Sequence, residues 1–274
     1  MPAMLACGCA LVSGLSQINV SDGGGAIHDA SDVEDVNMPV SDAGLATALQ
    51  LKTTCASTVE NAGLSFSAMP FTVSFWFRPD MPSSFTQDIR PIVWNGGRNT
   101  AEPGWLIGTQ AATLVFCASD VNASACAISG PMFNAVNHLI HIVGVSNPGG
   151  LNRSLQIWSL DATNGQTSHV MLGQSASAPN NWTSTEAFTV GGVGSNNRTC
   201  SFEVQGVIDD LRLWSAALTP AQLDSSYKQP LSCSDTNLAA YFKFDEGAGT
   251  TATSCAGKNQ LTLGGTYAWL PSPF

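Results

Sequence analysis

Short runs in which apolar and polar residues alternate constrain this chain more than any other feature. Alternation places every second side chain on one face, which is typical of a half-buried β-strand. The run at 71–77 is the clearest, and others occur at 89–94, 112–117, 139–145, 155–160, 187–190 and 238–244. Turn signatures such as Asn95-Gly96-Gly97 and Asn147-Pro148-Gly149-Gly150 separate them. The sequence therefore predicts an all-β fold, a two-sheet antiparallel β-sandwich or jelly roll.

One short helix is expected directly after the strand-like run at 206–214. Thr219 suits the N-cap, Pro220 the first helical position and Gln222 the third, which together form a capping box. Leu218 and Leu223 are spaced to pack against each other across this start. The pattern predicts a strand, a corner and one or two helical turns.

Asp209 is the candidate metal ligand of the chain. Strict alternation would place it on the face of Val207, Leu211 and Leu213, where a carboxylate is costly unless a cation or several donors satisfy it. A calcium ion could do so. Backbone N–H groups of the 216–222 corner could equally satisfy the carboxylate.

Composition excludes several classes of partner. Charged residues make up 11% of the chain and apolar residues 44%, and the formal net charge is -10. That charge would repel nucleic acid and an anionic membrane surface, so neither is expected as a partner. The chain also contains no run of ~18 or more apolar residues, and no transmembrane segment is expected.

The amino-terminal region differs in composition from the rest. Residues 1–20 are similar to a secretory leader, and Leu5-Ala6-Cys7 resembles the cleavage site of a bacterial lipoprotein, where Cys7 would carry a lipid anchor. An apolar leader without lipid is the alternative. Residues 21–44 hold six acidic and no basic residues, which predicts a flexible acidic linker. We expect the folded domain to span 45–274.

Six cysteines in this domain indicate disulfides rather than a zinc site, because their spacing matches no paired CxxC pattern. Cys117 and Cys126 flank a polar loop, and Cys233 and Cys255 flank a strand and turn, so each pair could close a short loop. Cys55 and Cys200 would then pair by elimination. Free buried thiols are the alternative.

Ligand binding is expected at aromatic residues flanked by polar loops. Trp94 with Asn95 and Arg98 forms one such group, and Asn181 with Trp182 forms the other. Tryptophans that merely cover the core would give the same pattern. No catalytic residue is predicted, because no strand carries two carboxylates spaced to act together as the acid and the nucleophile of a retaining glycosidase.

Read in order, several motifs resemble the laminin-G-like jelly roll of the concanavalin A-like lectin and glucanase superfamily. They include Phe71-Thr72-Val73-Ser74-Phe75-Trp76-Phe77, the 206–214 run with its helix start, and Phe244-Asp245-Glu246-Gly247. The resemblance covers about 46–274. One departure is Lys52-Thr53-Thr54-Cys55, which stands where the family often has Asp-Gly and casts doubt on a metal site in that loop.

The resemblance implies a module that recognises glycans or proteins outside the cell, with calcium in some members. We therefore expect an exported or surface-tethered, non-enzymatic domain that binds a glycan or an extracellular protein through its loops. A divergent glycoside hydrolase or lyase and a purely structural surface domain are the alternatives.

Overall fold

The computed structural model describes residues 46–274, except 54–55, 58–62, 81–86, 132–135, 150, 183, 185, 195–199, 228 and 230. All of them belong to one of two compact units, Met38–Phe274. The leader, the acidic linker and Cys7 lie outside the described residues. The leader, the linker, the lipid anchor and the domain boundary at 45 therefore stay predictions.

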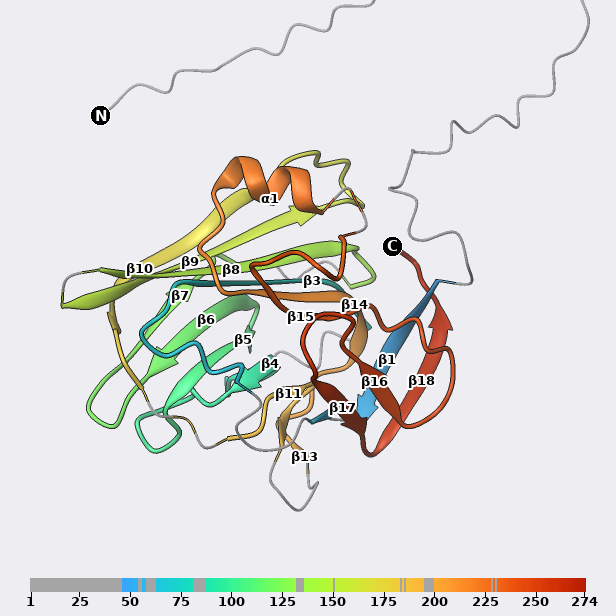
Figure 1. Ribbon diagram of the computed structural model, residues 1–274, viewed down its shortest axis with the longest axis horizontal. Coiled ribbons are helices and arrows are strands. Elements are labelled where there is room, and N and C mark those ends of the chain that lie inside the picture. Colours follow the sequence, from blue (N-terminus) through green and yellow to red (C-terminus); the bar gives the residue numbers. More distant parts are fainter. Residues whose placement is uncertain are drawn as a thin grey trace, which may run out of the picture. The chain divides into compact units, whose positions relative to one another are not determined.

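Two antiparallel sheets face each other and form the predicted sandwich (Figure 1). Sheet A runs in the order β10 (Val170–Pro179), β9 (Asn152–Asp161), β8 (Ile140–Gly149), β3 (Phe71–Pro79), β14 (Gly206–Trp214), β1 (Thr47–Thr53) and β18 (Thr266–Pro271), with β15 (Leu238–Phe242) paired to β14. Sheet B runs in the order β16 (Thr251–Thr253), β17 (Gln260–Leu263), β2 (Ala56–Ser57), β11 (Thr189–Val190), β4 (Arg90–Asn95), β5 (Gly104–Gln110), β6 (Thr113–Ser119) and β7 (Ser124–Ile128). A small ribbon pairs β12 (Val193–Gly194) with β13 (Cys200–Ser201). The predicted fold class is confirmed.

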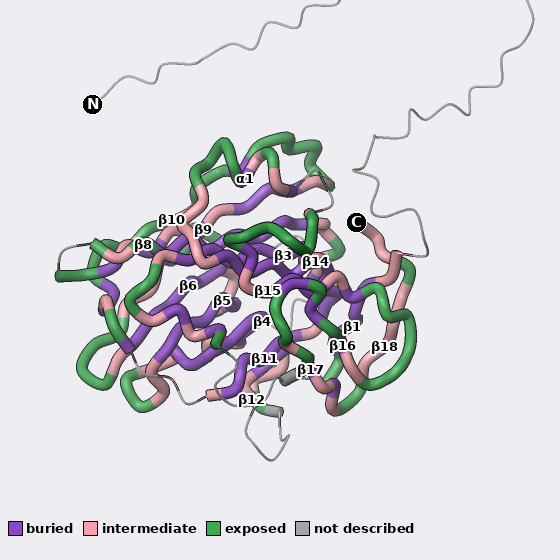
Figure 2. The backbone as a smooth tube through the Cα atoms, in the orientation of Figure 1, coloured by how far each residue is buried: buried purple, intermediate pink, exposed green. Residues whose placement is uncertain are grey.

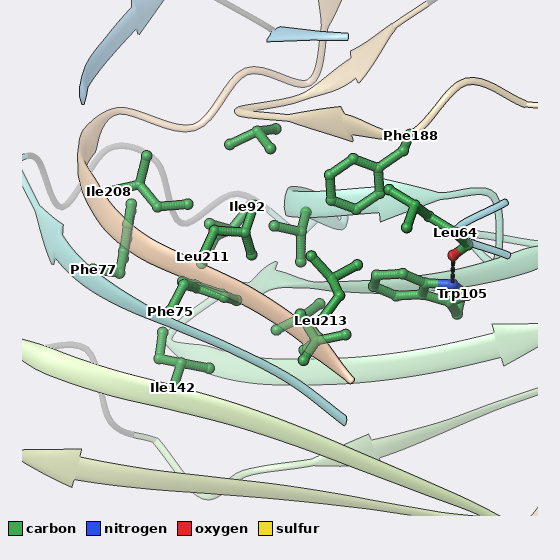
Figure 3. Packing of buried hydrophobic residues seen from close by; sticks show 14 of the residues in the cluster. Leu64, Phe75, Phe77, Ile92, Trp105, Ile142, Phe188, Ile208, Leu211 and Leu213 are labelled. Carbon is green, nitrogen blue, oxygen red and sulfur yellow. Dashed lines mark hydrogen bonds between the residues drawn. The ribbon is translucent and has the colours of Figure 1, made fainter. Parts of the chain in front are cut away.

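The core fills the space between the two sheets. Phe75 and Phe77 of β3 and Ile142 of β8 meet Ile92 of β4 and Trp105 of β5, all essentially without solvent exposure. Figure 3 shows the indole N–H of Trp105 donating to the carbonyl oxygen of Leu64 at 3.0 Å. Each such buried side chain stabilises the fold by roughly 1.5–3 kcal/mol relative to exposure.

Helix α1 (Pro220–Ser226) has the predicted amino-terminal cap. The Thr219 hydroxyl accepts from the Gln222 backbone N–H at 3.4 Å, and the Gln222 side chain accepts from the Thr219 N–H at 2.9 Å. Upstream of the helix, the Thr72 side chain donates to the carbonyl of Ala216 and accepts from the N–H of Leu218. The corner and helix are thereby fixed against the outer face of sheet A, as Figure 1 shows.

That outer face has a covered part and an uncovered part. Leu223 of α1 contacts Val143 and Val145 of β8, and Tyr227 contacts Trp76 of β3. Strand β10 at the sheet edge has mostly exposed or half-buried residues. In Figure 2 the strands in the middle of the sandwich are buried, whereas β8 ends in exposed residues.

No helix among the described residues combines the length and apolar composition that a membrane crossing requires.

Candidate functional site

Three of the five predicted ligand-binding residues are buried. Trp94 is 1% exposed, Asn95 4% and Trp182 5%. The Asn95 side chain donates to the carbonyl of Glu186 at 3.0 Å, and the Trp182 indole N–H donates to that of Ser65 at 2.9 Å. The three side chains therefore present little surface to a ligand.

The other two predicted residues reach the surface. Arg98 is half-buried, with its guanidinium 3.8 Å from the ring centroid of Phe202, and Asn181 is exposed. A cation–π contact of this kind holds a side chain in place but leaves its edge open to solvent. Ligand binding at the five predicted residues stays a prediction.

Asp209 does not face the core, and this expectation was wrong. A β-bulge between Asp209 and Arg212, with φ of 51° at Asp210, shifts the alternation. Ile208, Leu211 and Leu213 consequently point inward, whereas Asp209 lies opposite Trp76 on the outer face.

Asp209 is nonetheless only 7% exposed. Its carboxylate accepts from the Ser272 hydroxyl at 2.6 Å and from the Asp210 N–H at 2.9 Å, rather than from the helix corner. Burial, and then the charge of Asp210, holds the pKa of Asp209 well above its usual range. One hydrogen-bond donor thus engages each oxygen of the Asp209 carboxylate.

Within the described part of the chain, no group of three or more His, Cys, Asp or Glu side chains is placed to hold a metal. Calcium at Asp209 stays a prediction.

Two disulfides are present at the predicted pairs, Cys117–Cys126 between β6 and β7, and Cys233–Cys255. The Cys55–Cys200 pair stays a prediction, because Cys55 lies outside the described residues and the side chain of Cys200 is not described.

Beneath α1, a chain of polar contacts runs from two buried histidines to a partly exposed carboxylate on the helix. Nδ1 of His141 lies 2.7 Å from Nε2 of His169, whose Nδ1 lies 2.8 Å from Oδ1 of Asp224 on the helix. Burial lowers the pKa of both histidines, well below the usual value for His141, while Asp224 partly offsets the shift at His169. The chain of contacts ties the helix to the sheet.

A second network surrounds Arg212 on the same face. Its guanidinium donates to Oδ2 of Asp210 at 2.9 Å and to the carbonyl of Ser226, the last residue of α1, at 2.6 Å. The Tyr241 hydroxyl donates to Oδ1 of Asp210 at 2.5 Å. Burial raises the pKa of Tyr241, so the hydroxyl stays protonated as a donor. These groups are engaged with one another, which is the arrangement of a structural anchor.

The uncovered part of sheet A presents a different set of side chains, which we call the shelf. On β9, Leu155 and Ile157 point into the core, so Gln156 and Trp158 point outward. Across the ladder, Gln174 lies opposite Gln156, and Met171 lies opposite Trp158. The shelf comprises Asn147, Ser154, Gln156, Trp158, Met171 and Gln174.

The shelf continues into an open depression at the tip of the β8–β9 hairpin. The depression has a volume of about 460 Å³ and is lined by Asn147, Pro148, Gly149, Leu151, Asn152, Ser154 and Ala176. Leu151 is 94% exposed at its rim. Asn147 and Ser154 belong to both features, so shelf and depression form one continuous surface. Its volume falls within the range of small-molecule sites.

The indole of Trp158 is held in place at the border of the two parts. Its N–H donates to Oε1 of Gln156 at 3.3 Å, and its ring packs beside Val143, Val145 and Leu223 while staying partly exposed. Such a ring offers an apolar surface at low entropic cost, with neighbouring amides able to donate and accept hydrogen bonds. The arrangement can bind a flat, hydroxyl-rich ligand.

Sequence reasoning did not single out Trp158, although the alternation within 155–160 already separates Gln156 and Trp158 from the core-facing residues. The sequence does not reveal which part of the outer face of sheet A the helix α1 covers, and therefore not that Trp158 stays partly exposed.

Comparison with known proteins places this fold in a family. The model of the family Laminin_G_3, described as the Concanavalin A-like lectin/glucanases superfamily, matches residues 52–224. The chain belongs to this family. No curated protein matches the Laminin_G_3 chain significantly.

Solved structures with similarity to this Laminin_G_3 chain include a candidate carbohydrate binding protein from Bacteroides ovatus ATCC 8483, with 18% identity, a TM-score of 0.60, and coverage of 84% of this chain and 61% of that one. Others are the binding domain of Paraclostridial Mosquitocidal Protein 1 (17%, TM-score 0.48, 66% and 43%) and domains LG4-5 of the mouse laminin alpha1 chain (11%, TM-score 0.42, 64% and 44%). The chain thus spans about three fifths of the Bacteroides protein and less than half of the other two. At these identities the similarity shows the fold alone.

Proposed function

We propose that this chain is an exported, non-enzymatic binding module that recognises carbohydrate on the shelf. The supporting observation is the Trp158 indole fixed by Gln156, with the exposed amide of Gln174 opposite Gln156 on the next strand. Sugar rings combine an apolar C–H face with a rim of hydroxyl groups. An indole matches the former, and amides and hydroxyls match the latter.

The shelf is better suited to binding a glycan than to hydrolysing one. Glycoside hydrolysis in most families needs two carboxyl groups flanking the scissile bond. The residues of the shelf and the depression include no Asp or Glu, so this surface supplies no acid–base pair. A hydrolase or lyase would have to use carboxylates elsewhere, away from the exposed indole.

Export is supported by the two disulfides, which form and persist in oxidising compartments. An anchor at Cys7 followed by a flexible acidic linker would display the module at a cell surface. An extracellular protein bound at Arg98 and Asn181 is the competing proposal for the ligand.

A glycan array probed with the full chain tests the proposal. We expect binding to at least one glycan class, and at least tenfold weaker binding by Trp158→Ala. Trp158→Phe is the matched control, because it retains an aromatic face and should retain most of the affinity. Release of reducing sugars from a bound polysaccharide would contradict the non-enzymatic assignment, and binding that is unchanged in Trp158→Ala would contradict the site.

A further inference from the structure

Residues 140–179, which include β8, β9, β10 and their connections, contain four ionisable side chains, and all four are buried. They are His141, Arg153, Asp161 and His169. Each is engaged inside the protein. His141 pairs with His169, Arg153 donates to Ser146 and to the carbonyl of Met69, and Asp161 lies 2.8 Å from Nδ1 of His138.

The solvent-exposed outward positions of the same strands carry only groups that do not ionise. Amides, a hydroxyl, a thioether and an indole make up the shelf, and the depression adds Leu151, Asn152, Pro148, Gly149 and Ala176. A charged ligand bound here would lose water without gaining a counter-charge, which is unfavourable. An uncharged hydroxyl-rich ligand would exchange its hydrogen bonds with water for bonds to the amides.

The surroundings further disfavour an anion. Asp224, with about a third of its side chain exposed, flanks the shelf through its contact with His169, the residue before β10. Residues 45–274 contain 14 acidic and 10 basic side chains, a formal net charge of -4. Both contribute a negative potential that opposes the approach of a polyanion.

We propose that the shelf selects uncharged glycans and discriminates against those that carry carboxylates or sulfates. This inference rests on the proposed carbohydrate-binding function and specifies its ligand class. Its physical basis is the separation of charge on β8, β9 and β10, where ionisable side chains point inward or toward α1 and neutral polar side chains point outward.

Matched polysaccharides test the inference. Soluble glucan, mannan and galactan are each compared with the same polymer after oxidation of its primary alcohols to carboxylates, using the full chain and isothermal titration calorimetry at two salt concentrations. We expect a neutral polymer to bind with little dependence on salt, and its oxidised form to bind at least tenfold more weakly. Trp158→Ala should abolish the binding of the neutral polymer.

The possible failures are distinguishable. Equal or tighter binding of an oxidised polymer, lost in Trp158→Ala, would overturn the selectivity but leave the carbohydrate-binding surface in place. Binding of a neutral polymer that Trp158→Ala leaves intact would overturn the assignment to the shelf. Absence of binding to all six polymers and to the glycan array would overturn the proposed function together with this inference.

Gln174→Lys gives an independent test, because Gln174 is exposed and a longer cationic side chain fits there without repacking. We expect this variant to gain affinity for the oxidised polymers by about tenfold at low salt, and to lose that gain at high salt. Gln174→Glu is its matched control and should bind them no better than the unaltered chain. An unchanged preference in Gln174→Lys would contradict the inference.

Discussion

The two parts of the outer face of sheet A use the same strands for opposite purposes. Under α1, the outward residues His141 and Arg212 are buried. Arg212 donates to the carbonyl of Ser226 on the helix, whereas His141 contacts His169, which in turn contacts Asp224 on the helix. Beyond the helix, Gln156, Trp158 and Gln174 keep polar atoms or ring surface in contact with solvent. The polar groups of the covered part form their hydrogen bonds within the protein. Those of the uncovered part can form hydrogen bonds to a ligand.

This difference teaches that polarity alone does not identify a site. The covered part is richer in ionisable groups, yet each of the groups described above has a protein partner. The uncovered part has no ionisable group, but its aromatic surface and amides are accessible. Substitutions in the covered part should therefore affect stability, and those in the uncovered part should affect binding.

Of the substitutions considered, Arg212→Met should lower the stability most, because it removes the hydrogen bonds that join the covered part of sheet A to α1. It leaves the half-buried carboxylate of Asp210 without its cation and the carbonyl of Ser226 without its donor. We expect the free energy of unfolding to fall by about 2–3 kcal/mol, measured from urea denaturation, because a half-buried carboxylate and a carbonyl at the helix end each lose a charged donor. A loss below about 1 kcal/mol would show that this network is not an anchor.

Acidification should reduce the contribution that His141 and His169, in the covered part, make to the free energy of unfolding. Because burial lowers the pKa of His141 and His169 in the folded protein, the unfolded chain takes up their protons first as the pH falls below about 6.5. Their contribution is fully present above that pH and is lost as the pH falls through the lowered values. Asp209, whose pKa is raised, contributes in the opposite direction, since its stabilisation is lost as the pH rises.

The histidine contribution is isolated by comparing urea midpoints from pH 7.5 to pH 5 for the unaltered chain and for His141→Gln/His169→Gln. We expect the unaltered chain to lose more stability over this range than the double variant. Parallel pH profiles for the two proteins would refute the prediction.

The double variant Gln156→Ala/Gln174→Ala tests the uncovered part, where substitutions should affect binding and not stability. Removing two amides should weaken glycan binding about tenfold or more, equivalent to about 1.4 kcal/mol or more, because the ligand loses its hydrogen-bond partners. The free energy of unfolding should change by less than about 0.5 kcal/mol per site, since neither residue is buried. Calorimetric titration and urea denaturation measure the two quantities on one preparation.

The smallest effect is expected at the loops. Arg98→Ala and Asn181→Ala should leave glycan binding within about twofold of the unaltered chain, because neither residue belongs to the shelf. A tenfold loss in either variant would instead support a loop-based site and reverse the functional assignment of the two regions.

Much of the fold could be predicted from local patterns. Alternation identified the main strands, the Thr219–Gln222 capping box identified α1, and short loop closure identified the Cys117–Cys126 and Cys233–Cys255 pairs. These features depend on residues close in sequence.

The site could not be predicted in the same way, because it depends on contacts between distant segments. The bulge at Asp210 places a non-glycine residue at positive φ and reverses the face of Asp209. Trp182 is buried because its indole N–H reaches the carbonyl of Ser65, 117 residues away. Trp158 packs against Leu223 of α1 and stays partly exposed, a contact between residues 65 positions apart.

Hydrogen–deuterium exchange of the full chain, with and without the tightest-binding neutral polysaccharide, tests the central claim most directly. Protection should increase in β9, β10 and the β8–β9 hairpin, and should stay unchanged in the β4–β5 loop and in residues 180–182. Protection confined to those two loops, with β9 and β10 unaffected, would contradict the account.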